Sequence, residues 1–352
     1  MAIEPALNYR RILLTRLRFI GDVVLTTPAI RSVREACPSA YVAYLGERSA
    51  VSLLEHSPFL DELISFDFSR SSLLEQTRVS LILRRRKFDL VVDFYGNPRS
   101  ALLTWLSGAP VRVGPDRAGR GALYTLRVPR ESAPRTAVAF HNSYIATAGI
   151  PPTSAKPEIF ITDDERREAA QTLQQIEDNA RPIDLAGLIV GLHPGASWPA
   201  KRWAPGRFAD LAVRLSSELG AQIIITSGPR DEEATDVVKA RCAFPVRVVK
   251  NLPLRQLAAV ISRCQAFVSN DAGPMHIAAA LGVPTIGLFG PGEEDIWFPY
   301  DPRLGHFALR KDVPCHPCHL DFCNRLGDGY MECMTKLTTD EVFAAVKRSL
   351  AR

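Results

Sequence analysis

The stretch from Ser269 to Pro291, SNDAGPMHIAAALGVPTIGLFGP, constrains the fold more than any other part of this 352-residue sequence. A short apolar run precedes it, and Gly273-Pro274 opens a helical segment, because proline suits a first helical position that needs no N–H. Gly282 is typical of a helix end, and the apolar residues 283–289 predict a buried strand. Strand, glycine turn, helix and strand in succession predict a βαβ unit, whose helix N-terminus attracts phosphate.

The rest of the chain repeats this alternation in two series, one on each side of a proline-rich segment at residues 151–157. Apolar runs separated by helical patterns predict an α/β fold with doubly wound parallel sheets. The length favours two domains, which we place at residues 1–155 and 156–352, with a final helix at 339–350. No signal peptide is visible, because four arginines interrupt the first twenty residues, and a cytoplasmic location is predicted.

Charge is distributed unevenly along the chain. Residues 1–160 contain 21 Lys and Arg against 14 Asp and Glu, a net of +7, whereas the remainder has 22 against 24, or −2, which together give +5. A basic first half predicts an anionic partner, such as a phosphorylated saccharide or an anionic lipid. No zinc-finger, helix-turn-helix or aromatic-basic RNA motif accompanies the charge, so nucleic acid is not expected as a partner.

Four polar residues could carry chemistry or only structure. Asp22 follows the first strand, where it could be a helix N-cap or a base that takes a proton from an acceptor hydroxyl. Lys201 lies in the small-residue turn HPGASWPAKRW, where it could be solvated or could neutralise a diphosphate. Asp271 and His276 flank the predicted phosphate-binding helix end, where the plainer interpretation is an N-cap and a core histidine.

Several motifs together resemble those of a known family. The pattern D-x-G-P-M-H-x-A-A-A-L-G-x-P from Asp271 closely resembles the nucleotide-sugar signature of the bacterial ADP-heptose:lipopolysaccharide heptosyltransferases, glycosyltransferase family 9. GDVVLTTPAIR from Gly21, the turn at 193–203 and the D-x-x-G-x-x-R-S turn from Asp93 resemble further family motifs. The matches lie in both halves, in the expected order, and cover nearly the whole chain.

The resemblance implies two Rossmann-like domains facing a cleft, the GT-B arrangement, and an inverting transfer of heptose from ADP-heptose to the inner core of lipopolysaccharide at the inner membrane face. It implies Asp22 as base, Lys201 as the cation for departing ADP, and no metal for catalysis. The donor site would comprise Ala196, Ser197, Lys201, Glu232, Asp271, Ala272, Gly273, Met275 and His276. The acceptor site would comprise Asp93, Asn97, Arg99, Arg117 and Arg120.

Some alternatives remain open at this stage. Glu233 aligns as well as Glu232 with the family's ribose-binding glutamate, and Arg117 and Arg120 could be ordinary exposed loop residues. A transferase with another donor, an epimerase-like nucleotide-sugar enzyme or a non-catalytic nucleotide-binding module would share the fold. The final helix at 339–350 packs back across the cleft in related two-domain transferases, which implies a contact with the first domain.

A cysteine-rich segment near the C-terminus has no place in the transfer chemistry. The spacing C-x₂-C-x₄-C-x₉-C joins Cys315, Cys318, Cys323 and Cys333, with two histidines between the first three. Four thiolates could hold a structural zinc ion or an iron–sulfur cluster. The spacing matches neither a zinc ribbon nor a ferredoxin, so reduced thiols or an adventitious disulfide are the alternatives.

Overall fold

The computed structural model describes residues 8–67, 69, 72–129, 136–175 and 183–351. The chain divides into two compact units, Met1–Phe160 and Ile161–Arg352. The boundary predicted at 155/156 lies five residues before this division. The segment between the last helix of the first unit and Phe160 is bonded to that unit, because the backbone N–H groups of Thr153 and Glu158 donate to the hydroxyls of Ser32 and Thr27.

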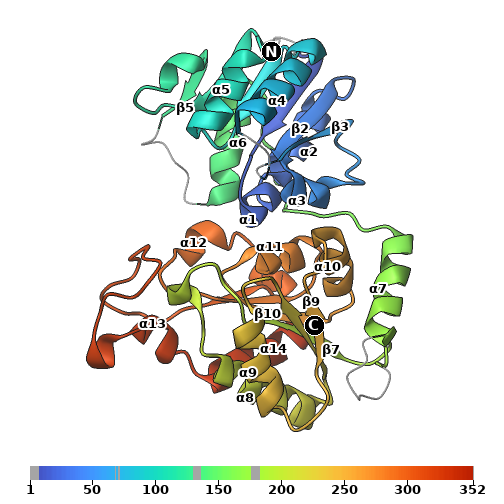
Figure 1. Cartoon of the computed structure of the whole chain (residues 1–352), viewed down its shortest axis with the longest axis vertical. Helices are drawn as coiled ribbons and strands as arrows, with labels where there is room; N and C mark the ends of the chain where they lie inside the picture. Colours follow the sequence, from blue (N-terminus) through green and yellow to red (C-terminus); the bar gives the residue numbers. More distant parts are fainter. Residues whose placement is uncertain (1–7, 68, 70–71, 130–135, 176–182, 352) are drawn as a thin grey trace. The chain divides into compact units, whose positions relative to one another are not determined.

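The first unit is a six-stranded parallel sheet flanked by helices (Figure 1). Its strand order, β3-β2-β1-β4-β5-β6, is the order of a dinucleotide-binding sheet. The elements in chain order are β1 Arg11–Thr15, α1 Ile20–Val24, α2 Thr27–Ala36, β2 Tyr41–Glu47, α3 Arg48–Val51, η1 Ser52–Leu54, β3 Glu62–Phe66, α4 Ser72–Arg86, β4 Leu90–Asp93, α5 Pro98–Leu106, β5 Val111–Pro115, η2 Gly121–Leu123, β6 Leu126–Val128 and α6 Ala137–Thr147.

The second unit repeats the same plan with a parallel sheet ordered β12-β11-β10-β7-β8-β9. Counted within the unit, this order is identical to that of the first sheet. The elements are α7 Asp163–Gln175, β7 Ile189–His193, η3 Pro199–Lys201, α8 Pro205–Leu219, β8 Gln222–Ser227, α9 Glu232–Arg241, β9 Arg247–Lys250, α10 Leu254–Ile261, β10 Ala266–Asn270, α11 Gly273–Ala280, β11 Thr285–Leu288, α12 Glu294–Trp297, η4 Pro302–Leu304, β12 Phe307–Leu309, η5 Gly327–Gly329, α13 Glu332–Thr335 and α14 Thr339–Leu350.

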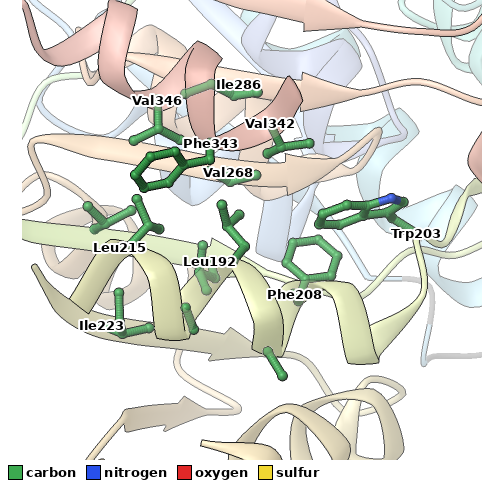
Figure 2. Close-up of a cluster of buried hydrophobic side chains, with 14 of the residues drawn as sticks. Leu192, Trp203, Phe208, Leu215, Ile223, Val268, Ile286, Val342, Phe343 and Val346 are labelled. Atoms are coloured by element: carbon green, nitrogen blue, oxygen red, sulfur yellow. The ribbon is translucent and has the colours of Figure 1, made fainter. Parts of the chain in front are cut away.

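The strands of both sheets are apolar on both faces, because helices cover each face of a doubly wound sheet. In the second unit, α8 and α14 pack on one face around the fully buried indole of Trp203 (Figure 2). Phe343 and Val346 attach α14 to this core, so the helix predicted at 339–350 lies on the sheet of its own unit. Its predicted contact with the first unit stays a prediction.

The helix after β10 has the predicted form. Pro274 occupies its first turn, and Gly282 follows its C-terminus with φ +76°, a left-handed conformation that favours glycine. Among the described residues, no helix is long and apolar enough to cross a membrane.

Candidate functional site

The motif residues gather at the same place in each unit. Each strand order reverses once, between β1 and β4 in the first sheet and between β7 and β10 in the second. In open α/β sheets, ligands bind outside the carboxyl ends of the two strands that flank this reversal. Asp93 is the last residue of β4, and the segments that follow β1, β7 and β10 contain Asp22, Lys201 and Asp271.

Asp22 is the third residue of α1, and its carboxylate is held from two sides. Its Oδ2 accepts a hydrogen bond from the backbone N–H of Phe19 at 3.0 Å, and its Oδ1 forms an ion pair with Arg16. Each of the two charged side chains is only 12% exposed. Asp22 is therefore not the N-cap, which is Phe19, although it does bond to the N-cap backbone.

Arg16 is a site residue that sequence analysis did not identify. Besides its ion pair with Asp22, it donates to the carbonyl of Phe94 at 2.9 Å, and its guanidinium lies 4.5 Å from the ring centre of Tyr95. Phe94 and Tyr95 belong to the turn after β4, so Arg16 links the two turns at the reversal of the first sheet. A basic residue directly after a buried strand is the signal that could have indicated it.

Asp93 organises the turn after β4 and has no exposed surface. Its oxygens accept hydrogen bonds from the backbone N–H groups of Tyr95 and Gly96, at 2.9 and 3.0 Å, and from the hydroxyl of Tyr124 at 2.7 Å. Burial raises the pKa of Asp93, and these donors oppose that rise. We therefore assign Asp93 to shaping the turn, which corrects the expectation of direct contact with an acceptor.

The other predicted acceptor residues surround this turn. Asn97 is the N-cap of α5, and its Oδ1 accepts from the backbone N–H of Ser100 at 2.7 Å. Arg99 lies half-buried with its guanidinium 5.3 Å from the ring centre of Phe66. Arg117 and Arg120 lie in the loop after β5, with Arg117 exposed and Arg120 partly buried. Their role in acceptor binding stays a prediction.

In the second unit, the turn after β7 meets the turn after β10 through a close ion pair. The Nζ of Lys201 lies 2.5 Å from Oδ2 of Asp271, and their side chains are 19% and 8% exposed. The ammonium also lies 4.5 Å from the ring centre of Trp198. Residues 70 positions apart in the sequence thus form one polar site, in which Asp271 holds the lysine at the edge of the sheet.

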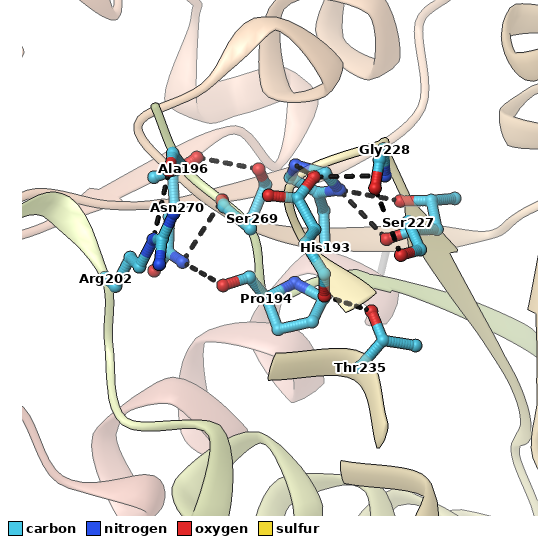
Figure 3. A network of polar contacts seen from close by, with 12 residues as sticks. His193, Pro194, Ala196, Arg202, Ser227, Gly228, Thr235, Ser269 and Asn270 are labelled. Carbon is cyan, nitrogen blue, oxygen red and sulfur yellow. Dashed lines mark hydrogen bonds and ion pairs between the residues drawn. The ribbon is translucent and has the colours of Figure 1, made fainter. Parts of the chain in front are cut away.

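Asn270, the last residue of β10, fixes the backbone of the same turn from within. Its side-chain amide donates to the carbonyls of Pro194 and Gly195, at 2.8 and 3.3 Å, and its Oδ1 accepts from the backbone N–H of Trp203 at 3.0 Å (Figure 3). The side chain has no exposed surface. Asn270 therefore holds both ends of the turn that contains Lys201, a role that sequence analysis missed.

Close packing around Gly195 explains the glycine of this turn. A Cβ at this position would lie 2.1 Å from Cγ of Asp231, so no larger residue fits. Asp231 accepts a hydrogen bond from the backbone N–H of Gly228 at 3.0 Å. His193, the last residue of β7, lies directly before the turn (Figure 3). Its Nδ1 is 3.0 Å from the carbonyl of Thr226, and burial lowers the pKa of its imidazole. These contacts tie the turn after β7 to the turn after β8.

The other residues predicted for the donor site in this region are Ala196 and Ser197 in the turn and Glu232 or Glu233 in α9. The carbonyl of Ala196 accepts from Nε of Arg202 at 3.0 Å, and Ser197 is exposed. Glu232 and Glu233 are both exposed in the first turn of α9, next to Asp231, so exposure does not distinguish between them and the choice stays open.

The helix N-terminus after β10 has no side-chain cap. Ala272 is the N-cap of α11, whereas Asp271 points to Lys201, so the interpretation of Asp271 as N-cap is wrong. The uncapped positive end of the helix dipole favours an anion. Met275 is fully buried, and the nearly buried His276 lies with its Nδ1 2.9 Å from the hydroxyl of Tyr300. Their role in donor binding stays a prediction.

A comparison with known families identifies the family to which these motifs belong. Residues 77–324 match the family described as glycosyltransferase family 9 (heptosyltransferase), which is more than half of the chain. The chain belongs to glycosyltransferase family 9. It is therefore a glycosyltransferase, and the family predicted from the motifs is confirmed. One similar family member is lipopolysaccharide heptosyltransferase 2 of Escherichia coli K12, which is 28% identical over 315 residues, 85% of this chain and 86% of that protein.

Solved structures of family 9 members share the fold. A glycosyl transferase of this family from Veillonella parvula superposes with a TM-score of 0.82 at 25% identity, with 99% of each chain covered. The E. coli ADP-heptose lipopolysaccharide heptosyltransferase II superposes with a TM-score of 0.78 at 23% identity, covering 97% of this chain and 98% of that chain. The predicted α/β class with two Rossmann-like units, the GT-B fold, is confirmed.

Among the described residues, the cysteine-rich segment of this family 9 member gives no support to the possible zinc site. All seven cysteines are free thiols, and in the described part of the chain no three His, Cys, Asp or Glu side chains are arranged to hold a metal ion. Cys315 Sγ lies 3.5 Å from the guanidinium of Arg325, whose charge opposes a dication, and Cys323 accepts from a backbone N–H. Burial and neighbouring thiols raise the pKa of Cys333 to about 11, which disfavours the thiolate that metals require.

Proposed function

We propose that this family 9 protein transfers heptose from ADP-heptose to an inner-core sugar of lipopolysaccharide by direct, inverting displacement. The observation that carries the proposal is the ion pair of Lys201 and Asp271 beside the uncapped N-terminus of α11, at the strand-order reversal of the second sheet. Two similar proteins support the sugar: one is a lipopolysaccharide heptosyltransferase and the other an ADP-heptose lipopolysaccharide heptosyltransferase.

The second unit would bind the ADP part of the donor. The dipole of α11 and the ammonium of Lys201 would take the diphosphate, and the small residues Ala196 and Ser197 would let the backbone approach it. Glu232 or its neighbour would accept hydrogen bonds from ribose hydroxyls. Since Asp271 already holds Lys201 in place, the cation would not need to reorganise as negative charge develops on departing ADP.

The first unit would bind the acceptor and supply the base. The Oδ atoms of Asp22 are fixed by Arg16 and by the backbone of Phe19, which sets the orientation of the carboxylate. This carboxylate would remove the proton from the acceptor hydroxyl as that oxygen attacks the anomeric carbon, on the face opposite to ADP. Arg99, Arg117 and Arg120 would contact anionic groups of the acceptor, in agreement with the net +7 of this half.

The acceptor of this reaction is lipid-anchored, so the proposal includes peripheral contact with the cytoplasmic face of the inner membrane. Each of the two partners, the nucleotide sugar and the anionic glycolipid, then meets a different unit of the chain. This division agrees with the charge, because the second half is close to neutral.

The first test is ligand-induced thermal stabilisation with ADP, UDP and GDP and their sugars at matched concentrations. A ligand that binds only the folded protein raises its melting temperature by mass action. Selective stabilisation by ADP and ADP-heptose is expected. Preference for UDP or GDP would overturn the donor while leaving the fold intact. Release of free or epimerised sugar without an acceptor would identify an epimerase-like enzyme instead of a transferase.

A further inference from the structure

Two neighbouring helices of the first unit expose an unusual number of apolar side chains. Of thirteen large apolar residues that are strongly exposed in the described part of the chain, five lie on α4 and α5. These are Leu73, Leu74, Leu81, Leu102 and Trp105. The two helices pack side by side on one face of the first sheet (Figure 1). We name the outward surface of this pair the α4–α5 face.

The helical pattern shows that these side chains are not poorly packed core residues. On α4 the buried positions are Glu75, Val79 and Leu83, at four-residue intervals along one stripe. The exposed leucines lie on the opposite side of that helix. On α5, Leu102 and Trp105 are three residues apart and share the outer side, with Trp105 half-exposed. Each helix therefore buries one side against the rest of the unit and also exposes apolar side chains on its outer side.

A groove runs between the N-terminal halves of the two helices. Its volume is about 500 Å³, and its lining comprises Leu73, Gln76, Asn97, Pro98, Arg99 and Leu102. Two leucines thus form apolar walls beside a guanidinium. An open groove with two exposed leucines beside a cation suits contact with lipids that carry an anionic headgroup.

Cations border the apolar surface at the other end of α4. Arg84, Arg85 and Lys87 are exposed, and none of them has a carboxylate partner among the residues that the structure describes. The guanidinium of Arg84 lies close to Gly108, two residues after the end of α5. It is 3.8 Å from the position that a Cβ on Gly108 would take. Uncompensated arginines beside exposed leucine and tryptophan are the side chains that anchor a protein in the interface of an anionic bilayer.

We propose that the α4–α5 face is the surface by which this protein docks on an anionic phospholipid bilayer. Trp105, Leu102 and the other exposed leucines enter the headgroup region, while Arg84, Arg85 and Lys87 contact lipid phosphates. We choose an anionic bilayer as the partner because cations border the apolar stripe. That this bilayer is the inner membrane rests on the proposed function. An acidic protein partner would use the same cations but would not require lipid.

A second exposed apolar cluster provides a matched control. Phe322 and Leu326, in the cysteine-rich segment of the second unit, are more exposed than Leu102 and Trp105. The nearest cation in sequence, Arg325, is engaged by Glu332 and Cys315. If exposed apolar area alone caused membrane binding, this cluster would act at least as strongly as the α4–α5 face.

The test measures co-sedimentation of the full chain with vesicles of phosphatidylglycerol and phosphatidylcholine in about a 1:2 ratio, against pure phosphatidylcholine. The wild type is expected to bind the anionic vesicles selectively, and more weakly at high salt. The R84Q/R85Q variant should bind about thirtyfold more weakly, which corresponds to about 2 kcal/mol at roughly 1.4 kcal/mol per tenfold. L102S/W105S should lose a similar amount, whereas F322S/L326S should bind like the wild type.

Lipids brominated on their acyl chains give a second readout, because they quench only tryptophan that enters the bilayer. Quenching of the wild type should largely disappear in W105F, whose folding is checked by its melting temperature. Absence of vesicle binding by the wild type, or loss of binding only in F322S/L326S, would overturn the assignment. Neither donor nor acceptor is present, so failure here and failure of sugar transfer are separate results.

Discussion

Replacing Asp22 by asparagine tests the proposed base most directly. Asparagine keeps the shape of the side chain and one of its two oxygens, so it can accept from Arg16 or from the backbone N–H of Phe19 but not from both, and it cannot take a proton at neutral pH. A positioned general base contributes about a hundredfold to ten-thousandfold to rate. We therefore expect D22N to lower kcat by at least about a hundredfold, with ADP affinity within about twofold of the wild type, since the donor residues belong to the second unit.

The structure also predicts what this substitution costs in stability. Arg16 and Asp22 are each 12% exposed, and removing one partner of a buried ion pair costs about 3–5 kcal/mol when the other charge is left without partners. Arg16 keeps two other contacts, the carbonyl of Phe94 at 2.9 Å and the ring of Tyr95 at 4.5 Å. The loss for D22N should therefore be smaller, about 1–2 kcal/mol, because a neutral amide oxygen can still accept from the guanidinium.

The assay is single-turnover transfer from ADP-heptose to the acceptor, with ADP binding and thermal unfolding measured on the same samples. D22A serves as a comparison: it should abolish transfer too, but unfold more readily than D22N, since it leaves Arg16 without any acceptor at that position. R16M should fold and bind ADP but transfer more slowly, because it releases the carboxylate from its orientation. If D22N retained wild-type turnover with normal ADP binding, Asp22 would not be the base.

Three further predictions concern the second unit. K201A should lower kcat by about a hundredfold or more in the transfer assay and weaken ADP binding in calorimetry, because it removes the cation that Asp271 positions; an unchanged kcat would exclude that role. W203A should cost about 4 kcal/mol and lower the melting temperature by about 12 °C in calorimetry, since this indole is fully buried; a shift under about 3 °C would contradict that packing. Burial alone would raise the pKa of Glu165, but hydrogen bonds from Arg255 and the backbone of Thr162 lower it to about 2. The stability that E165Q removes should therefore be complete at pH 7 and fade as the pH falls from about 4.3 to about 2 in denaturant titrations; a loss independent of pH would refute the ionic origin.

Local sequence patterns predicted most elements and the family. Proline at the start of a helix and glycine after its end delimit α11, and the helix at 339–350 has the bounds that its pattern indicates. Alternating apolar runs and helical segments also determine a doubly wound parallel sheet, because a buried strand and an amphipathic helix each need the other. The short edge strands β6, β9 and β12 were not predicted, since three or four residues contain too little periodicity to recognise.

The partners of the polar site residues were decided only by tertiary structure. Lys201 could have been solvated and Asp271 could have capped a helix, but the order of β7 and β10 places the two turns side by side and makes them an ion pair. The sequence also could not decide whether Cys333 is a metal ligand or a protonated thiol. Burial and the neighbouring thiols determine the pKa of its sulfur, and neither can be read from the sequence.

The sequence by itself therefore determined most of the elements, the fold they build and which residue types stand at the strand ends, because these depend on local propensity and periodicity. Only the tertiary structure decided that Arg16 holds Asp22, that Asn270 holds the turn of Lys201, and that Asp93 is sealed inside its own turn. The Asn270 contacts join residues far apart in the chain, the Arg16–Asp22 pair depends on how the segment after β1 folds back, and the sealing of Asp93 depends on burial. No local pattern records these distances or exposures.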